Sequence, residues 1–228
     1  MLDTANMGEG GYACVNTTPW RRNSVVTLLA SIGPTGFTLY PLQGLFGCAR
    51  RGYLAKFPAQ SHNALPDHPD GHNACIRSAA RSFFDSPTQG ELFIDTPLRT
   101  LLNRDFRFRL NQFMRQNPCL NGRLTLLLQE DELHALPAAS MQIKPACHEL
   151  SLAGVQFGLH LLRFDQQAWL NCPEIHDISP CVVVRYRDTL TQDRGPIQSL
   201  ATMIRHCRSS GWPLLADFRD VKSPQVSR

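Results

Sequence analysis

Residues 123–130, with the sequence RLTLLLQE, are the stretch that decides the fold. The apolar side chains stand at adjacent positions and not only at alternate ones, so both faces of a strand here would be covered. Residues 155–161 (VQFGLHL) and 182–186 (VVVRY) show the same pattern, and residues 212–216 (WPLLA) supply a last strand. Strands that are apolar on both faces are typical of a parallel sheet covered by helices.

Helical patterns separate these strands. Residues 76–84 have apolar positions at helical spacing. Asn103 can cap a second helix, and Pro118 follows its end. Pro196 can open a third helix, which Gly211 can end. The alternation of strands and helices predicts an α/β fold, with a TIM-like (β/α) barrel as the expected architecture and a doubly wound open sheet as the alternative.

The first part of the chain is less regular. Residues 1–22 are polar and rich in glycine, so we expect a flexible N-terminal lead, followed by a single domain over residues 23–228. Short strands are predicted at residues 25–30, 37–42 and 52–57.

Composition restricts the class of protein. The 228 residues carry a net charge of +4, which is too little to indicate nucleic-acid binding by itself. The eight cysteines form no C-x-x-C pair, and we expect buried, reduced thiols in a cytosolic protein. Residues 1–16 show no signal peptide, and the longest early apolar run, residues 25–32, is too short to span a bilayer. The expected location is therefore the cytoplasm, with no membrane contact.

In their order and spacing these elements resemble the bacterial EAL domain family. Residues 123–130 resemble the family strand that ends in E-x-T-E, and residues 154–163 (GVQFGLHLLR) stand where the family has a Gly-Val strand leading into D-D-F-G. Residues 214–221 (LLADFRDV) resemble the A-E-G-V-E segment, residues 92–97 (LFIDTP) the strand with the family's Asn, and residues 52–56 (GYLAK) the E-A-L signature.

The resemblance covers roughly residues 37–228 and implies a TIM-like barrel of the EAL type. The family's last strand and helix would follow Gln225. The expected barrel is therefore either incomplete at its C-terminus or closed with the help of residues 25–30.

The resemblance also implies where a metal site would stand. Active EAL domains hydrolyse cyclic di-GMP with Mg²⁺ or Mn²⁺ held by carboxylates at the C-terminal ends of the strands. Five positions here are remnants of that site: Asp95, Glu130, His160, Asp217 and Asp220. Three positions have lost the carboxylate, namely Leu54, Leu127 and Leu161, and the family's lysine position falls on Val184 or Arg185. Hard divalent cations need several oxygen ligands and leucine offers none, so we expect no bound metal, no cofactor and no hydrolysis.

Three functions follow from this resemblance. The first hypothesis is a catalytically inactive EAL-like protein that binds a transcription factor or another regulator and represses virulence or motility genes. The second is a cyclic di-GMP receptor that binds without cleaving, with Arg163 or Arg185 at the ligand. The third is a residual phosphodiesterase. No helix-turn-helix, zinc finger or RNA-binding signature is present, so direct DNA binding is not expected.

Other groups of polar residues have both a structural and a functional interpretation. His62, His68 and His72 lie with two Asp in a Pro-rich stretch, residues 58–73, which we interpret as a surface loop and not as a metal site. His160 is interpreted as structural in preference to a catalytic base, and residues 130–132 (EDE) as a charged cap after a strand. A solvated helix face is the main interpretation of the arginines Arg104, Arg107, Arg109 and Arg115, and an acidic partner or a phosphate is the alternative.

Overall fold

The computed structural model describes residues 26–28, 37–45, 52–57, 69–85, 90–129, 132, 140–161, 181–185 and 194–217. The strands are β1 (Val26–Leu28), β2 (Phe37–Gly44), β3 (Gly52–Lys56), β4 (Glu91–Asp95), β5 (Leu124–Gln129), β6 (Gln156–Leu161), β7 (Cys181–Arg185) and β8 (Leu214–Asp217). The helices are α2 (Pro69–Asp85), α3 (Leu98–Leu102), α4 (Arg104–Gln116), α6 (Ser140–Ser151) and α8 (Arg194–Ser210), with a 3-10 turn η1 at Pro118–Leu120. Among these helices, none is long and apolar enough to cross a membrane.

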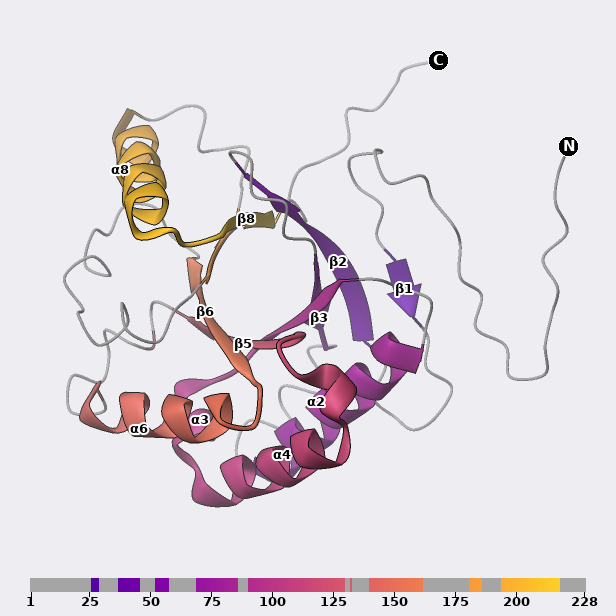
Figure 1. The fold of residues 1–228 in the computed structure, drawn as a ribbon. Coiled ribbons are helices and arrows are strands. Elements are labelled where there is room, and N and C mark those ends of the chain that lie inside the picture. The colour runs from indigo at the N-terminus through magenta and orange to yellow at the C-terminus, as the bar shows by residue number, and fades with distance from the viewer. Residues whose placement is uncertain are drawn as a thin grey trace, which may run out of the picture.

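The sheet closes into a barrel. Strands β3 to β8 are parallel and lie side by side in chain order, while β2 is antiparallel to both β3 and β8. Leu42 pairs with Gly52 across one edge of β2 and with Asp217 across the other. Figure 1 shows the resulting ring of strands with the helices around its outside. The predicted TIM-like barrel is therefore confirmed, and the open-sheet alternative is wrong.

Closure depends on β2, since its second edge is shared by two strands. Residues 42–44 pair with β8, and residues 37–39 pair with β1. β1 thus covers the part of this edge that β8 does not reach. The stretch predicted at residues 25–30 adds to the wall of the barrel, but β2 makes the closing contact.

Two separate apolar cores follow from the alternation of side chains along the strands. Side chains that point outward pack beneath the helices, and those on strands β5, β6 and β7 include Leu126, Leu128, Phe157, Leu159, Val182 and Val184. Side chains that point inward come from strands all around the ring and fill the barrel: Leu42, Leu54, Phe93, Leu127, Cys181, Val183 and Leu215. The barrel interior is therefore a packed core and not a pore.

Helix ends follow the capping signals in the sequence. The Asn103 side chain accepts a 3.0 Å hydrogen bond from the Phe106 amide at the start of α4, as predicted. At the end of α8, Gly211 has φ of +70°, and the amide of Trp212 donates to the carbonyl of Cys207 at 2.8 Å. This pattern is a Schellman motif, in which glycine avoids the strain of a left-handed backbone.

Helices α2 and α6 depart from the sequence prediction, and the short helix α3 was not predicted either. α2 begins at Pro69, within the stretch of residues 58–73 that we expected to be a loop. A proline in the first turn of a helix loses no hydrogen bond, so it can open the helix. α6 was not predicted, because Pro145 lies inside it and interrupts the usual helical pattern.

The cysteines fall into two groups. Cys75, Cys147, Cys181 and Cys207 are buried free thiols, as expected, whereas Cys119 is exposed and corrects that expectation. Burial raises the pKa of Cys147 and of Cys207 to about 12, so both stay protonated and unreactive at neutral pH. Cys14, Cys48 and Cys172 lie outside the described residues.

Gly158 provides a test of packing inside the barrel. It pairs with Leu127 on one side and with Cys181 on the other. A Cβ atom added here would collide with the Cys181 Sγ and lie 2.9 Å from the Leu127 Cδ2. We expect Gly158→Ala to lower the free energy of unfolding by about 1–3 kcal/mol in chemical denaturation. Cys181→Ala should recover part of this loss, and strictly additive losses in the double variant would contradict the packing described.

Candidate functional site

Polar side chains gather at one mouth of the barrel, where the C-terminal ends of the parallel strands meet. The residues at or next to these ends are Lys56 on β3, Asp95 on β4, Gln129 on β5, His160 on β6, Arg185 on β7 and Asp217 on β8. Each stands two positions after an inward-facing residue of its strand, and period-two alternation therefore turns it toward the barrel axis.

The backbone around Asp95 is fixed on both sides. The Thr96 amide donates to the Leu127 carbonyl at 2.9 Å, which extends the pairing of β4 and β5 by one residue. The Thr96 hydroxyl, which is fully buried, donates to the Ile94 carbonyl at 3.3 Å. These contacts fix the backbone next to Asp95, so the residue is held at the mouth independently of the partners of its side chain.

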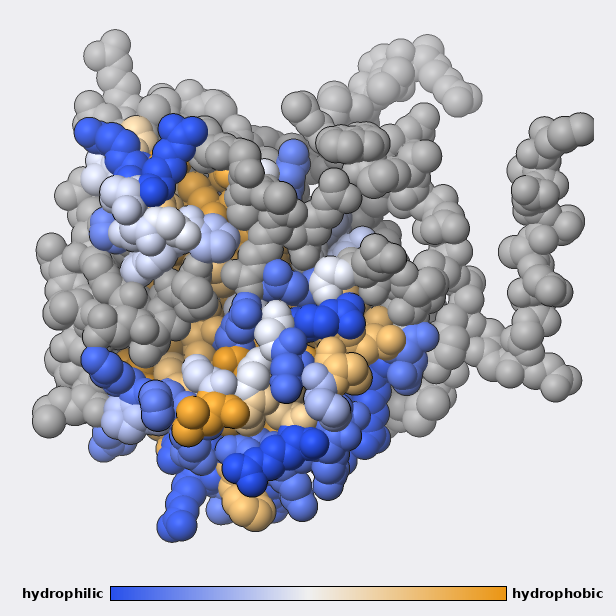
Figure 2. Space-filling view, viewed as in Figure 1, coloured by the Kyte–Doolittle hydropathy of each residue, from blue (hydrophilic) through white to orange (hydrophobic). Residues whose placement is uncertain are grey.

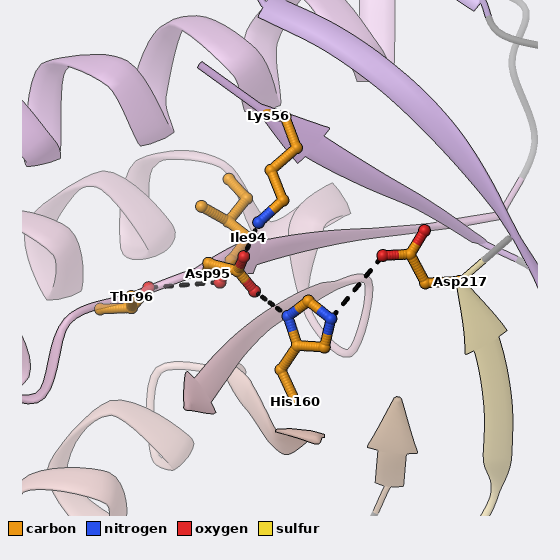
Figure 3. A network of polar contacts seen from close by, with 6 residues as sticks. All are labelled: Lys56, Ile94, Asp95, Thr96, His160 and Asp217. Atoms are coloured by element: carbon orange, nitrogen blue, oxygen red, sulfur yellow. Dashed lines mark hydrogen bonds and ion pairs between the residues drawn. The ribbon is translucent and has the colours of Figure 1, made fainter. Parts of the chain in front are cut away.

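Four side chains then form a continuous row across the mouth (Figure 3). The Lys56 Nζ donates to the Asp95 Oδ2 and forms an ion pair with it. The His160 Nδ1 lies 2.6 Å from the other oxygen of the same carboxylate, Oδ1. The His160 Nε2 lies 3.7 Å from the Asp217 Oδ2. The row joins β3, β4, β6 and β8, which are far apart in the sequence.

Burial makes this row electrostatically important. The side chains of His160 and Asp217 are 0% exposed, that of Asp95 is 10% exposed, and that of Lys56 is 24% exposed. An ionised carboxylate only accepts hydrogen bonds, so the His160 Nδ1 must carry a proton to bind Asp95. Buried carboxylates are costly unless they are paired, and here protein groups supply the partners.

The arrangement does not fit a pair of divalent metal ions. Mg²⁺ and Mn²⁺ take several oxygen ligands, and Asp95 and Asp217, the carboxylates of this mouth within the described residues, already contact Lys56 and His160. The positions below them are occupied by Leu54 and Leu127, which are both 0% exposed. Among the described residues, no group of three or more His, Cys, Asp or Glu is placed to hold a metal.

The residues predicted for the site separate into three groups. Those on the inner face of the barrel are Leu54, Asp95, Leu127, His160 and Asp217, with Arg185 on the same face of β7 as Val183. Those on the outer face are Leu161 and Val184, which pack in the core beneath the helices. Glu130, Arg163 and Asp220 lie outside the described residues.

The position of Leu161 corrects the expectation that it is a lost metal ligand. It follows His160 directly on β6 and therefore points to the opposite side, so a carboxylate there would face the helices and not the mouth. The same alternation decides the position of the family's lysine, because Val184 faces outward and only Arg185 can reach the mouth.

Lys56 was missed as a site residue, although a signal for it exists. It stands two positions after Leu54 on a strand, so both side chains share the inner face. The resemblance to the E-A-L signature marks Leu54 as the position of the lost glutamate, but it gives no role to Lys56, two residues after it.

Other predicted polar groups have structural contacts. The Glu132 Oε2 accepts a 2.6 Å hydrogen bond from the Leu98 amide at the start of α3, while residues 130 and 131 of the predicted strand cap lie outside the described residues. The ring of His72, on α2, lies 5.9 Å from that of Phe106, while His62 and His68 lie outside the described residues.

Comparison with known proteins gives the fold family. No protein-family model matches the sequence. A search of curated proteins finds no similar sequence. Solved structures are similar, however. The EAL domain of Mycobacterium smegmatis DcpA matches with a TM-score of 0.55 and 13% identity, over 79% of this chain and 77% of that chain. The chain has the fold of an EAL domain.

Two longer proteins contain the same EAL-like fold. Klebsiella pneumoniae BlrP1, in a complex with manganese and cyclic di-GMP, matches with a TM-score of 0.60 and 16% identity, over 85% of this chain and 51% of that chain. The S helix-GGDEF-EAL part of Vibrio cholerae LapD, bound to cyclic di-GMP, matches with a TM-score of 0.61 and 14% identity, over 80% and 47%. This chain thus spans about half of each of these two structures, and the similarity establishes its fold.

The pair of Lys56 and Asp95 can be tested by a double-mutant cycle. Lys56→Met removes the cation from a nearly buried carboxylate, and we expect it to lower the free energy of unfolding by about 1–3 kcal/mol. When Asp95→Asn is combined with Lys56→Met, the loss of unfolding free energy should be smaller than the sum of the two single losses. The expected coupling energy is about 1–2 kcal/mol in chemical denaturation.

Lys144→Met is the matched control, because Lys144 is exposed on α6 and its loss should cost no more than about 0.5 kcal/mol. Equal effects at positions 56 and 144, with no coupling to Asp95, would contradict the row of contacts at the mouth.

Proposed function

We propose that this chain is an EAL-like regulatory domain that does not hydrolyse cyclic di-GMP and that acts by contact with another protein. The observation that carries the proposal is the engagement of Asp95 and Asp217 by Lys56 and His160 at the mouth of the barrel. In a metal-dependent phosphodiesterase such carboxylates must be available to the ions that activate water and stabilise the leaving oxygen. Here the Lys56 ammonium contacts Asp95, and the His160 imidazole lies between Asp95 and Asp217.

The packing beneath the row supports the same proposal. Leu54 and Leu127 are fully buried and belong to the core inside the barrel, together with Phe93. Restoring glutamate at either leucine would place a charge in this core, which costs several kcal/mol unless a cation neutralises it. The interior is therefore built as an apolar support for the fold and not as a metal site.

The finer assignment rests on the resemblance to single-domain EAL-like regulators. On that basis we infer a cytoplasmic protein that binds a transcription factor or another regulatory protein and represses virulence or motility genes. A fold alone does not fix a function, so the contact surface has to be identified separately.

Binding of cyclic di-GMP without cleavage is the alternative function. BlrP1 and LapD were solved with this nucleotide, and the present chain has the cationic side chains of Lys56 and Arg185 at the mouth of its barrel. Calorimetric titration with cyclic di-GMP, in Mg²⁺ and in EDTA, separates the two proposals. Heat of binding that is equal in both buffers would support the receptor, and its absence would support regulation by protein contact alone.

Absence of hydrolysis is the central prediction for this function. Purified protein given radiolabelled cyclic di-GMP with Mg²⁺ or Mn²⁺ should release no linear dinucleotide, because two carboxylates engaged by Lys56 and His160 cannot also hold a metal pair. A catalytically active EAL enzyme serves as the positive control in the same buffers. Linear product from the wild-type chain that disappears in Asp217→Ala would show that the domain is a phosphodiesterase.

A further inference from the structure

Helices α2 and α4 present a basic surface on the outside of the barrel. They pack against each other, and the Asn73 side chain on α2 donates to the Phe106 carbonyl on α4 at 3.2 Å. The described exposed charges of these two helices are Arg77, Arg81, Arg104, Arg109 and Arg115 against Asp85 and Asp105. Five cations against two anions give this surface a net positive charge.

An apolar side chain stands among these arginines. Phe108 is 65% exposed, so most of its ring surface is open to a partner. Arg104 precedes it by one helical turn, and Arg115 follows it by two, so all three lie along one stripe of α4. Figure 2 shows the hydrophilic surface over this part of the molecule, with apolar side chains between the hydrophilic ones.

The neighbouring arginines have defined positions. The guanidinium carbons of Arg77 and Arg81 each lie 5.7 Å from the centre of the Phe113 ring, which is buried between α2 and α4. Stacking on an aromatic ring restricts an arginine, so less side-chain entropy is lost when a partner binds.

Arg107 does not belong to this surface, although the sequence groups it with the other arginines. Its Nε donates to the Glu149 Oε2 at 2.7 Å, and its Nη1 donates to the last carbonyls of α3 at Leu101 and Leu102. Arg107 thus links α4 to α3 and α6, and this structural role distinguishes it from the exposed arginines.

We propose that the surface formed by Arg77, Arg81, Arg104, Phe108, Arg109 and Arg115 is a docking site for an acidic protein segment that carries an apolar stripe. Phe108 is the apolar anchor, and the arginines select negative charge around it. Aromatic and arginine side chains are the residue types that dominate binding energy at protein interfaces. This inference rests on the proposed function and identifies the surface through which the regulatory contact is made.

The probe for this surface is a synthetic 20-residue helical peptide with a leucine stripe flanked by glutamates, followed by fluorescence anisotropy. We expect the wild-type chain to bind it at least about tenfold more tightly than a peptide in which lysines replace the glutamates. Phe108→Ala, and separately the pair Arg104→Glu and Arg115→Glu, should each weaken binding at least about tenfold while the melting temperature stays unchanged.

Matched controls lie elsewhere on the protein. Leu152→Ala removes an apolar side chain that is 78% exposed, and Arg205→Glu reverses an exposed charge on α8. Both should leave binding of the acidic peptide unchanged. Equal affinity for the two peptides, no binding at all, or equal losses in the control variants would overturn the proposal.

Two further outcomes have a definite meaning. Tighter binding to duplex DNA of arbitrary sequence, with no effect of Phe108→Ala, would assign the basic surface to nucleic acid and overturn the proposal. Hydrolysis of cyclic di-GMP by a chain that still binds the acidic peptide through Phe108 would refute the proposed function and leave the docking surface in place. The two failures are therefore distinguishable.

Discussion

The carboxylate of Asp95 lies nine-tenths buried at the end of a central strand, and a charge in that position must be neutralised. Lys56 contacts one of its oxygens and His160 the other, while the far side of the imidazole faces Asp217. Four strands of the barrel converge on these side chains. The row therefore provides protein partners for carboxylates at the mouth of an EAL-like barrel, a place where metal ions would otherwise be their partners.

The rest of the interior agrees with this constraint. Leu54, Phe93 and Leu127 fill the barrel next to the row, so these inner positions are apolar. The fold does not depend on carboxylates at these positions, and other parts of its surface can carry function. An exposed Phe108 among arginines on α4, outside the ring of strands, is a feature that stability of the barrel does not require.

The strands and the barrel could be predicted from the sequence, since runs such as residues 123–130 are apolar on both faces and have few other folded solutions. The N-terminal helix cap at Asn103 could also be predicted from the sequence. Helix α6 could not be predicted, because Pro145 lies inside it and interrupts the usual helical pattern. At the site, Asp95, His160 and Asp217 were identified by motif, but the inward or outward direction of Leu161 and Val184 depends on register, which a motif does not specify. Lys56 was missed because the resemblance to the E-A-L signature gives no role to the residue two positions after Leu54.

The most direct test is a crystal structure of the wild-type chain grown with Mn²⁺ and cyclic di-GMP, with anomalous scattering measured near the manganese edge. The account predicts no manganese peak between Asp95 and Asp217, with Lys56 and His160 still in contact with Asp95. A manganese peak coordinated by both carboxylates, with the Lys56 side chain turned away, would contradict it.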